Sequence, residues 1–338
     1  MHNKKILTAL WFVIFSSGAV FFFLLNVSYG SADINIMDIA GIVLGQADQN
    51  ETHSIIIQRI RLPRALASIG AGAALAIAGF LLQSYFSNPI VEPFVLGISS
   101  GASLFVGLVI IGGITFGLQQ ITPVYMFLGA FAGAILVMLI VMFAATKVKS
   151  IITLLIIGLM AGYLCSAAIS ILSTFAERER LAHFAIWNMG SFAGFTWSHI
   201  RIMYAIVIPM LLCSFLMAKP LNALNMGDRY AKSMGINVKA TRYGLILLSS
   251  VLTAAVTAFA GPVSFIGLAV PHICRIVFRT ADSRILIPAA ILGGAFMASL
   301  CDFCARNILS PRELPLGAIT ALIGAPIVVF LLTRKEKF

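Results

Sequence analysis

The chain has 338 residues, of which 60% are hydrophobic and only 10% are charged, whereas charged residues make up about 25% of soluble domains. This composition excludes an ordinary soluble enzyme, a disordered regulator and a nucleic-acid-binding domain, and it favours a protein of the membrane. The formal net charge of +11 then reports orientation, because lysine and arginine collect in the cytoplasmic loops of membrane proteins.

Ten apolar segments with lengths close to that of a membrane-spanning helix follow one another along the chain. The first follows Lys4 and Lys5 like a signal peptide, but it is too long for one and lacks a clear cleavage site, so we expect it to remain as a helix. We predict one all-α transmembrane domain over residues 1–338, with a cytoplasmic loop over 218–242. The ten segments are 6–27, 65–86, 94–116, 124–145, 151–175, 202–217, 243–260, 263–278, 285–308 and 316–333.

Ten crossings place both termini on the same side of the membrane. If that side is the cytoplasm, fifteen of the 23 basic residues lie inside, including every lysine, and the net charge is +11 inside and +1 outside. The positive-inside rule supports this orientation. All the basic residues left outside are arginines, which pair with carboxylates in two-bonded geometry better than lysines do.

The sequence lacks the motifs of an enzyme or of an ion-driven pump. There is no G-x-x-x-x-G-K-[ST] phosphate loop, and ionisable residues inside the apolar segments are scarce, Asp302 being the clearest. Cys301 and Cys304 have C-x-x-C spacing but no second ligand pair, so we expect buried thiols rather than a metal site. We therefore expect no cofactor on this chain and an energy source in another polypeptide. A self-contained ion-coupled carrier or a membrane-embedded enzyme is the alternative.

Glycine pairs spaced four residues apart occur in three segments. Such pairs let helix backbones approach closely in lipid. We expect them to pack helices within one bundle, and a dimer face is the alternative. The pairs are Gly97 and Gly101, Gly129 and Gly133, and Gly158 and Gly162.

Two blocks of sequence are more specific than these general features. The first runs from Arg61-Leu-Pro-Arg64 through Asn88-Pro-Ile-Val-Glu92-Pro93 to Gly97-Ile-Ser-Ser-Gly101. The second runs from Gly261-Pro-Val-Ser-Phe to Pro271-His272-Ile-Cys-Arg275 and is followed by Asp302-Phe-Cys-Ala-Arg306 and Glu313-Leu-Pro-Leu-Gly317. Together they resemble the permease subunits of type II ABC importers, the FecCD-type family that takes up iron chelates, haem and vitamin B12. The resemblance covers nearly the whole chain from residue 61 onward.

The resemblance implies a complex in the cytoplasmic (inner) membrane of a bacterium. A homodimer of ten-helix subunits would bind two ATPase subunits, which hold ATP and Mg²⁺, on the cytoplasmic side, and one substrate-binding protein on the outer side. The chain itself would not be an enzyme. Its substrate would be a ferric siderophore, haem or a cobalamin-type corrinoid, with a siderophore as the leading expectation.

The resemblance also implies an ATPase-coupling loop of two short helices within 218–242. We expect Gly235 to supply the turn between them, because glycine accepts positive φ without strain. A basic amphipathic loop on the membrane surface is the alternative. The candidate coupling residues are Gly227, Asp228, Arg229, Ala231, Met234 and Gly235.

Arg61, Arg64 and Arg306 match family positions that form basic pockets for carboxylates of the binding protein. The alternative is snorkelling of arginine at a membrane interface. Asp302 lies four residues before Arg306, the favourable order for an ion pair within a helix, so we expect these two to pair.

The translocation path and its gate are expected in two further places. The resemblance implies that the stretch 97–101 and the fifth helix, Thr153 to Ser173, contribute to the path, and that this helix and the turn before it form the cytoplasmic gate. The alternative is that these are packing residues. The candidates are Gly97, Ser99, Ser100, Gly101, Ser150 and Thr153.

Overall fold

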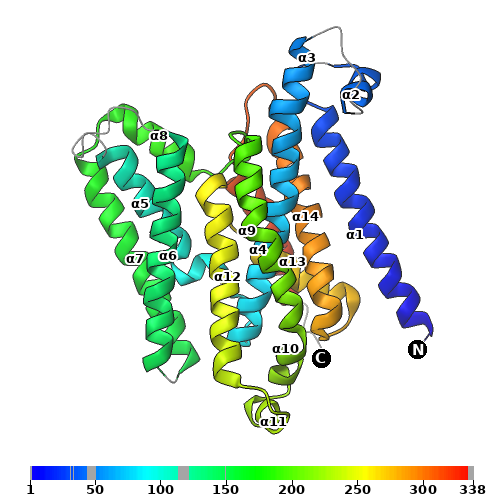
Figure 1. Cartoon of the computed structure of the whole chain (residues 1–338), viewed down its shortest axis with the longest axis vertical. Helices are drawn as coiled ribbons and strands as arrows, with labels where there is room; N and C mark the ends of the chain where they lie inside the picture. The colour runs from blue at the N-terminus through cyan, green and yellow to red at the C-terminus, as the bar shows by residue number, and fades with distance from the viewer. Residues whose placement is uncertain are drawn as a thin grey trace.

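The computed structural model describes residues 2–30, 32, 34–43, 51–112, 122–148 and 150–333; the described residues form helices and connecting turns, with no strand among them (Figure 1). The predicted all-α fold is confirmed. The predicted topology also depends on residues that lie outside the described part, namely residues 113–116, Asp33, Asp48, Lys149, Arg334, Lys335, Glu336 and Lys337.

Each predicted apolar segment corresponds to one described helix. Seven helices of the described part are long and apolar enough to cross a membrane, while α5, α13 and α15 are shorter apolar helices. The ten are α1 (His2–Ser28), α4 (Leu62–Phe86), α5 (Ile98–Gly112), α6 (Pro123–Lys147), α7 (Ile151–Thr174), α9 (Trp197–Leu216), α12 (Val238–Ala260), α13 (Ile266–Phe278), α14 (Ser283–Asn307) and α15 (Leu316–Thr333).

Short helices join these ten. They are α2 (Ile36–Val43), α3 (Glu51–Ile55), the π-helical turn η1 (Ile56–Arg61), the 3₁₀ turn η2 (Pro93–Leu96), α8 (Arg178–Asn188), α10 (Ala218–Asn225) and α11 (Asp228–Ser233).

The second apolar helix starts earlier than its hydropathy predicts. Instead of beginning at residue 65, it is continuous from Thr52 to Phe86 and includes the arginines of η1. Pro63 lies just after η1, and the wider π turn accommodates a proline that cannot donate a hydrogen bond and whose ring crowds the preceding turn.

Helix α4 lies at the centre of the bundle because small residues let its neighbours approach. A Cβ on Gly72 would overlap the Gly294 carbonyl of α14, and a Cβ on Gly79 would overlap the Gly267 carbonyl of α13. As a result α4 is almost entirely buried, whereas α1 lies at the periphery (Figure 1).

The predicted glycine pairs also pack helices within the chain. A Cβ on Gly101 would lie 2.6 Å from the Gly133 carbonyl, which joins α5 to α6. A Cβ on Gly97 would lie 2.8 Å from the Gly158 carbonyl and from the Gly162 amide nitrogen, so the end of η2 packs directly on α7. These contacts account for close packing inside one subunit.

The bundle has two ends that differ in the short helices they carry (Figure 1). We call them the α2 end, with α2, α3 and α8, and the α11 end, with α10 and α11. Helices α1 and α14 run in the same direction, since Phe22 packs on Phe303 and Arg306 reaches the Asn26 carbonyl. Both helices therefore start at the α11 end and finish at the α2 end.

Candidate functional site

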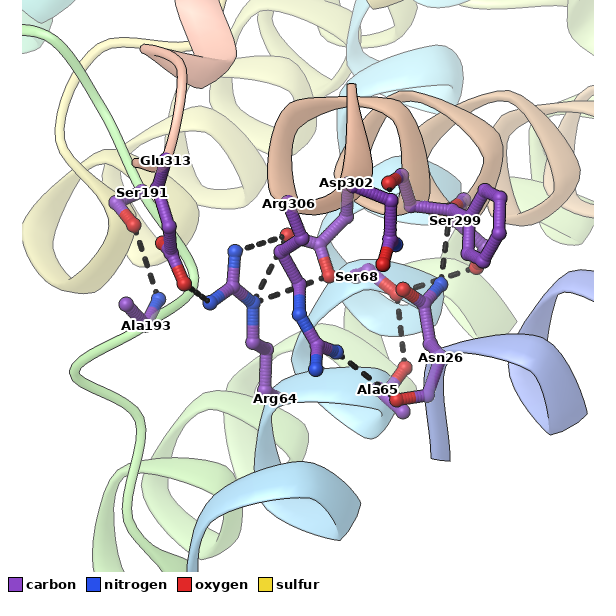
Figure 2. Close-up of polar contacts among 12 residues, drawn as sticks. Asn26, Arg64, Ala65, Ser68, Ser191, Ala193, Ser299, Asp302, Arg306 and Glu313 are labelled. Carbon is purple, nitrogen blue, oxygen red and sulfur yellow. Dashed lines mark hydrogen bonds and ion pairs between the residues drawn. The ribbon is translucent and has the colours of Figure 1, made fainter. Parts of the chain in front are cut away.

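Arg64 is the centre of a buried ionic cluster at the α2 end (Figure 2). Its Nε and Nη2 donate to Asp302 Oδ1 at 3.0 and 2.9 Å, and its Nη1 donates to Glu313 Oε1 at 2.7 Å. The side chain of Asp302 is fully buried and that of Arg64 is 6% exposed, whereas that of Glu313 is 45% exposed. We call Arg61, Arg64, Arg306, Asp302 and Glu313 the arginine cluster.

The other two arginines of the cluster bond to carbonyl groups at the end of α1. Arg61 Nη1 donates to the Val27 and Ser28 carbonyls at 3.1 and 2.7 Å, and its Nη2 donates to the Ala32 carbonyl. Arg306 donates to the carbonyls of Asn26 and Tyr29, both at 2.9 Å. A Cβ on Gly30 would lie within 3 Å of both guanidinium groups, so this glycine allows them to converge.

The structure brings the three predicted docking arginines together, around a pocket of about 330 Å³. They are more buried than a docking rim requires, with Arg61 2% and Arg64 5% exposed. The expected pairing of Asp302 with Arg306 is wrong. Asp302 instead faces Arg64 on the antiparallel helix α4, because the tight α4–α14 packing places that guanidinium closer to the carboxylate. Binding of a partner at this pocket stays a prediction.

A second feature is a cavity of about 630 Å³ among α5, α7, α8 and α15. Its polar lining consists of hydroxyl and amide groups, and no charged side chain is present among its described lining residues. Ser103 Oγ and Asn188 Oδ1 lie 2.9 Å apart there. The polar lining residues are Ser100, Ser103, Ser166, Ser170, Asn188 and Ser264.

The predicted path residues meet this cavity in part. Ser100 lines it, whereas Gly97 and Gly101 lie in helix contacts and Ser99 is buried at 4% exposure. Ser166 and Ser170 also line the cavity, and they lie in the fifth apolar helix, which is predicted to contribute to the path although the sequence does not single out these two serines. They repeat at i,i+4 on an otherwise apolar helix, and this spacing places both hydroxyls on one face.

One short segment connects the cavity with the arginine cluster. The segment 313–317 carries Glu313, and its Leu314 N–H donates to the Ala305 carbonyl of α14 at 2.8 Å. The N–H groups of Leu316 and Gly317 then donate to the carbonyls of Gly190 and Met189 at the end of α8, at 3.3 and 3.2 Å. Pro315, Gly317 and Ala318 line the cavity.

The α11 end contains the predicted coupling loop as two short helices, α10 and α11. Asp228 accepts two hydrogen bonds from Arg242 Nη2, at 2.9 and 3.0 Å, and the buried Ala231 packs α11 against its neighbours. Arg229 is exposed and Met234 is 59% exposed.

The predicted place of Gly235 is wrong in one respect. Its φ of +77° is positive as expected, but the turn it makes joins α11 to α12. The turn between α10 and α11 is made by Gly227, whose φ is +107°. Both positions favour glycine, and the sequence does not say which of the two separates the short helices.

Helix α10 is fastened to the start of α14. Asn222 Nδ2 donates to Asp282 Oδ1 at 2.6 Å, and the Ser283 N–H donates to Asn222 Oδ1 at 2.7 Å. The pKa of the Asp282 carboxyl is lowered, first by the hydrogen bond from the Arg284 backbone N–H and then by that from Asn222. The opposite end of α14 carries Asp302, so one helix links the coupling loop with the arginine cluster.

The predicted gate and the coupling loop face one cleft of about 500 Å³ at the α11 end. Ser150 lines this cleft together with Asp228, Lys232 and Arg242. Its hydroxyl also accepts from the Thr153 backbone N–H at 3.3 Å, which caps the start of α7. The gate role of Ser150 and Thr153 stays a prediction.

The chain is similar to several known transport proteins. A model of the FecCD transport family matches residues 18–334. The hemin transport system permease HmuU of Yersinia pestis is 35% identical over 323 residues, 95% of this chain and 96% of the relative. The vitamin B12 import system permease BtuC of Salmonella typhi is 36% identical over 283 residues, 84% and 85% of the two chains. A solved structure of a metal-chelate type ABC transporter in an inward-facing conformation superposes with a TM-score of 0.84 at 27% identity, covering 98% of this chain and 99% of that one.

Proposed function

Because this chain belongs to the FecCD transport family, we propose that it imports a ferric siderophore, haem or a corrinoid across the bacterial cytoplasmic membrane. It is an integral membrane permease of the ABC importer type and not an enzyme. In the proposed complex a homodimer binds two ATPase subunits, which hold ATP and Mg²⁺, and one substrate-binding protein. The chain itself holds no cofactor.

The arrangement of α10 and α11 is the observation that carries the proposal. The two helices project at one end of the bundle (Figure 1). They are tied to α12 through Asp228 and Arg242 and to α14 through Asn222 and Asp282. A movement imposed on this loop therefore reaches two core helices. Such a loop suits an ATPase socket better than a loop resting on the membrane surface.

Charge supports the α11 end as the cytoplasmic side. This end carries the basic residues of the coupling loop, Lys219, Arg229, Lys232, Lys239 and Arg242, and the positive-inside rule assigns such clusters to the cytoplasm. Both termini then lie in the cytoplasm, and the α2 end with its arginine cluster faces the binding protein.

The cavity among α5, α7, α8 and α15 supports a path for a bulky chelate. Its hydroxyl and amide groups offer hydrogen bonds but no fixed charge, and a transport path must bind its cargo weakly enough to release it. Helix α7, which lines the cavity, also carries exposed apolar side chains, including Tyr163 at 65% and Leu164 at 72% exposure, and Phe175 just after it is 83% exposed. A second copy of the chain packed there closes the cavity along a dimer axis.

Replacement of Gly235 tests the coupling role of the loop. Gly235 has positive φ, and a Cβ added there would meet no neighbouring atom within 4 Å, so Gly235→Val strains the turn by about 1–2 kcal/mol while its Cβ makes no clash. We expect the purified complex with its ATPase to assemble while stimulation of ATP hydrolysis by the loaded binding protein is lost. Gly244→Ala, whose new Cβ would meet only flexible atoms of Met217 at 3.8 Å, is the matched control. Full stimulation in Gly235→Val would contradict the coupling role.

A further inference from the structure

The arginine cluster contains one more positive than negative charge among its described members. Three guanidinium groups face two carboxylates, and Arg61 and Arg306 have backbone carbonyls as their hydrogen-bond acceptors. These groups line a pocket that opens at the α2 end. Guanidinium groups bind carboxylates in preference to neutral acceptors. One further carboxylate would therefore balance the excess positive charge of the pocket.

The two carboxylates on Arg64 are held differently. Asp302 is fully buried and accepts from both Nε and Nη2. Glu313 accepts from Nη1 alone, is 45% exposed, and lies in the wall of the pocket. Figure 2 shows Arg64 between them. An exposed ion pair is weak because water and salt screen it, so Glu313 is the carboxylate that an incoming acid can displace.

Displacement of Glu313 can affect the cavity because Glu313 and several cavity-lining residues belong to one continuous segment. Glu313 begins the segment 313–317, whose backbone bonds to the end of α8 and whose later residues line the cavity and start α15. Leu314 and Leu316 of this segment pack in the apolar core, and the ion pair of Glu313 is the polar side-chain contact of the described residues that ties the segment to α4. Loss of that contact leaves this wall of the cavity with fewer restraints.

We propose that Glu313 occupies on Arg64 the place of an acidic side chain of the substrate-binding protein, and that on docking this side chain replaces Glu313 and frees the segment 313–317 in the wall of the cavity. This inference rests on the proposed function, because it requires a binding protein at the α2 end. Glu313 then has a positioning role. It competes with the carboxylate of the binding protein for Arg64, and it links docking of that protein to the segment that lines the cavity.

The first test measures affinity for the binding protein. The permease–ATPase complex in lipid nanodiscs is titrated with fluorescently labelled binding protein. Glu313→Gln removes the competing charge, so we expect the Kd to fall about two- to fivefold, the range of an exposed ion pair. The matched control is Glu179→Gln, which removes an exposed carboxylate of α8 at the same end but outside the cluster, and we expect it to leave the Kd unchanged.

The second test follows the segment in protein with Glu313 intact. A spin label on Leu309→Cys, a position that is 57% exposed, reports mobility between α14 and Glu313, after subtraction of the signal from labelled protein without this change. We expect the label to become more mobile when the binding protein docks. Two results would overturn the inference. One is normal docking of the binding protein with no change in the mobility of the label, and the other is normal docking in which Glu313→Gln binds no more tightly than Glu179→Gln. A wild-type complex that binds no binding protein would overturn the proposed function as well.

Discussion

At the scale of single residues, the Arg64–Asp302 pair joins α4 to α14 inside the protein. Asp302→Leu removes a fully buried carboxylate and leaves the guanidinium without its main partner, which typically costs about 3–5 kcal/mol. We expect a much lower thermal unfolding temperature in detergent. Arg64→Met combined with Asp302→Leu removes both charges and is expected to recover most of the loss. Equal stability of the single and double variants would contradict this account.

Gly72 sets the distance between the same two helices. A Cβ there would overlap the Gly294 backbone carbonyl, so we expect Gly72→Ala to destabilise the protein by about 1–3 kcal/mol or more. Gly107→Ala in α5 is the matched control. Its new Cβ would make ordinary contacts of 3.5 Å and longer, and alanine favours the helix by about 1 kcal/mol. Thermal unfolding that ranks the two variants the other way would show that the contact is not tight.

The Glu92 carboxyl gives the stability a pH dependence. Burial raises its pKa, and the hydrogen bond from the Phe265 backbone N–H lowers it by less. A raised folded-state pKa stabilises the protein below the ordinary value of about 4.3, and this stabilisation is lost as the pH rises through the raised value. Glu92→Gln is therefore expected to unfold at a higher temperature than wild type at neutral pH, with the gap closing toward pH 4. A gap that stays constant with pH would exclude titration of Glu92 as its cause.

The sequence identifies the important arginines but not their partners. Arg61, Arg64 and Arg306 could be selected because they belong to specific sequence blocks. The i,i+4 spacing then predicted Arg306 as the ion-pair partner of Asp302, whereas the observed partner, Arg64, is 238 residues away in the sequence. That choice depends on the antiparallel register of α4 and α14, which the Gly72–Gly294 contact sets. The register between two helices that are far apart in the chain cannot be read from a single sequence.

At the scale of elements, two hydrogen bonds of Asn222 attach α10 of the coupling loop to the start of α14. Asn222→Ala removes both hydrogen bonds to the start of α14. We expect faster amide hydrogen exchange in α10, with the buried part of α12 as the internal reference. Unchanged exchange in α10 would mean that packing, and not Asn222, holds it in place.

The apolar segments were predictable as elements because ten runs of hydrophobic residues are a strong signal. The residues at which these helices begin were less predictable. The helix that contains Arg61 and Arg64 begins at Thr52 and not at residue 65 as predicted, since buried arginines with partners count as polar in any hydropathy window. The two short helices were also expected, but two glycines of positive φ fit the turn between them, and the choice between Gly227 and Gly235 requires the backbone.

At the scale of the whole molecule, α14 connects the two functional ends. Its first turn bonds to α10 through Asp282, and its last turns bond to α4 and α1 through Asp302 and Arg306. The family and the all-helical fold were predictable from the sequence blocks together with the hydropathy. The serine-lined cavity was not, because its walls come from helices far apart in the chain and its polar groups are scattered singly among apolar residues.

We expect this permease to import a metal chelate or corrinoid only when a separate ATPase drives it. The most direct measurement is uptake into vesicles that contain the permease with its ATPase, supplied with the binding protein loaded with ferric siderophore, haem or cobalamin. We predict that at least one of these accumulates, and only when hydrolysable ATP is present on the ATPase side. Equal accumulation in vesicles that contain the permease alone would contradict the claim and favour a self-contained carrier.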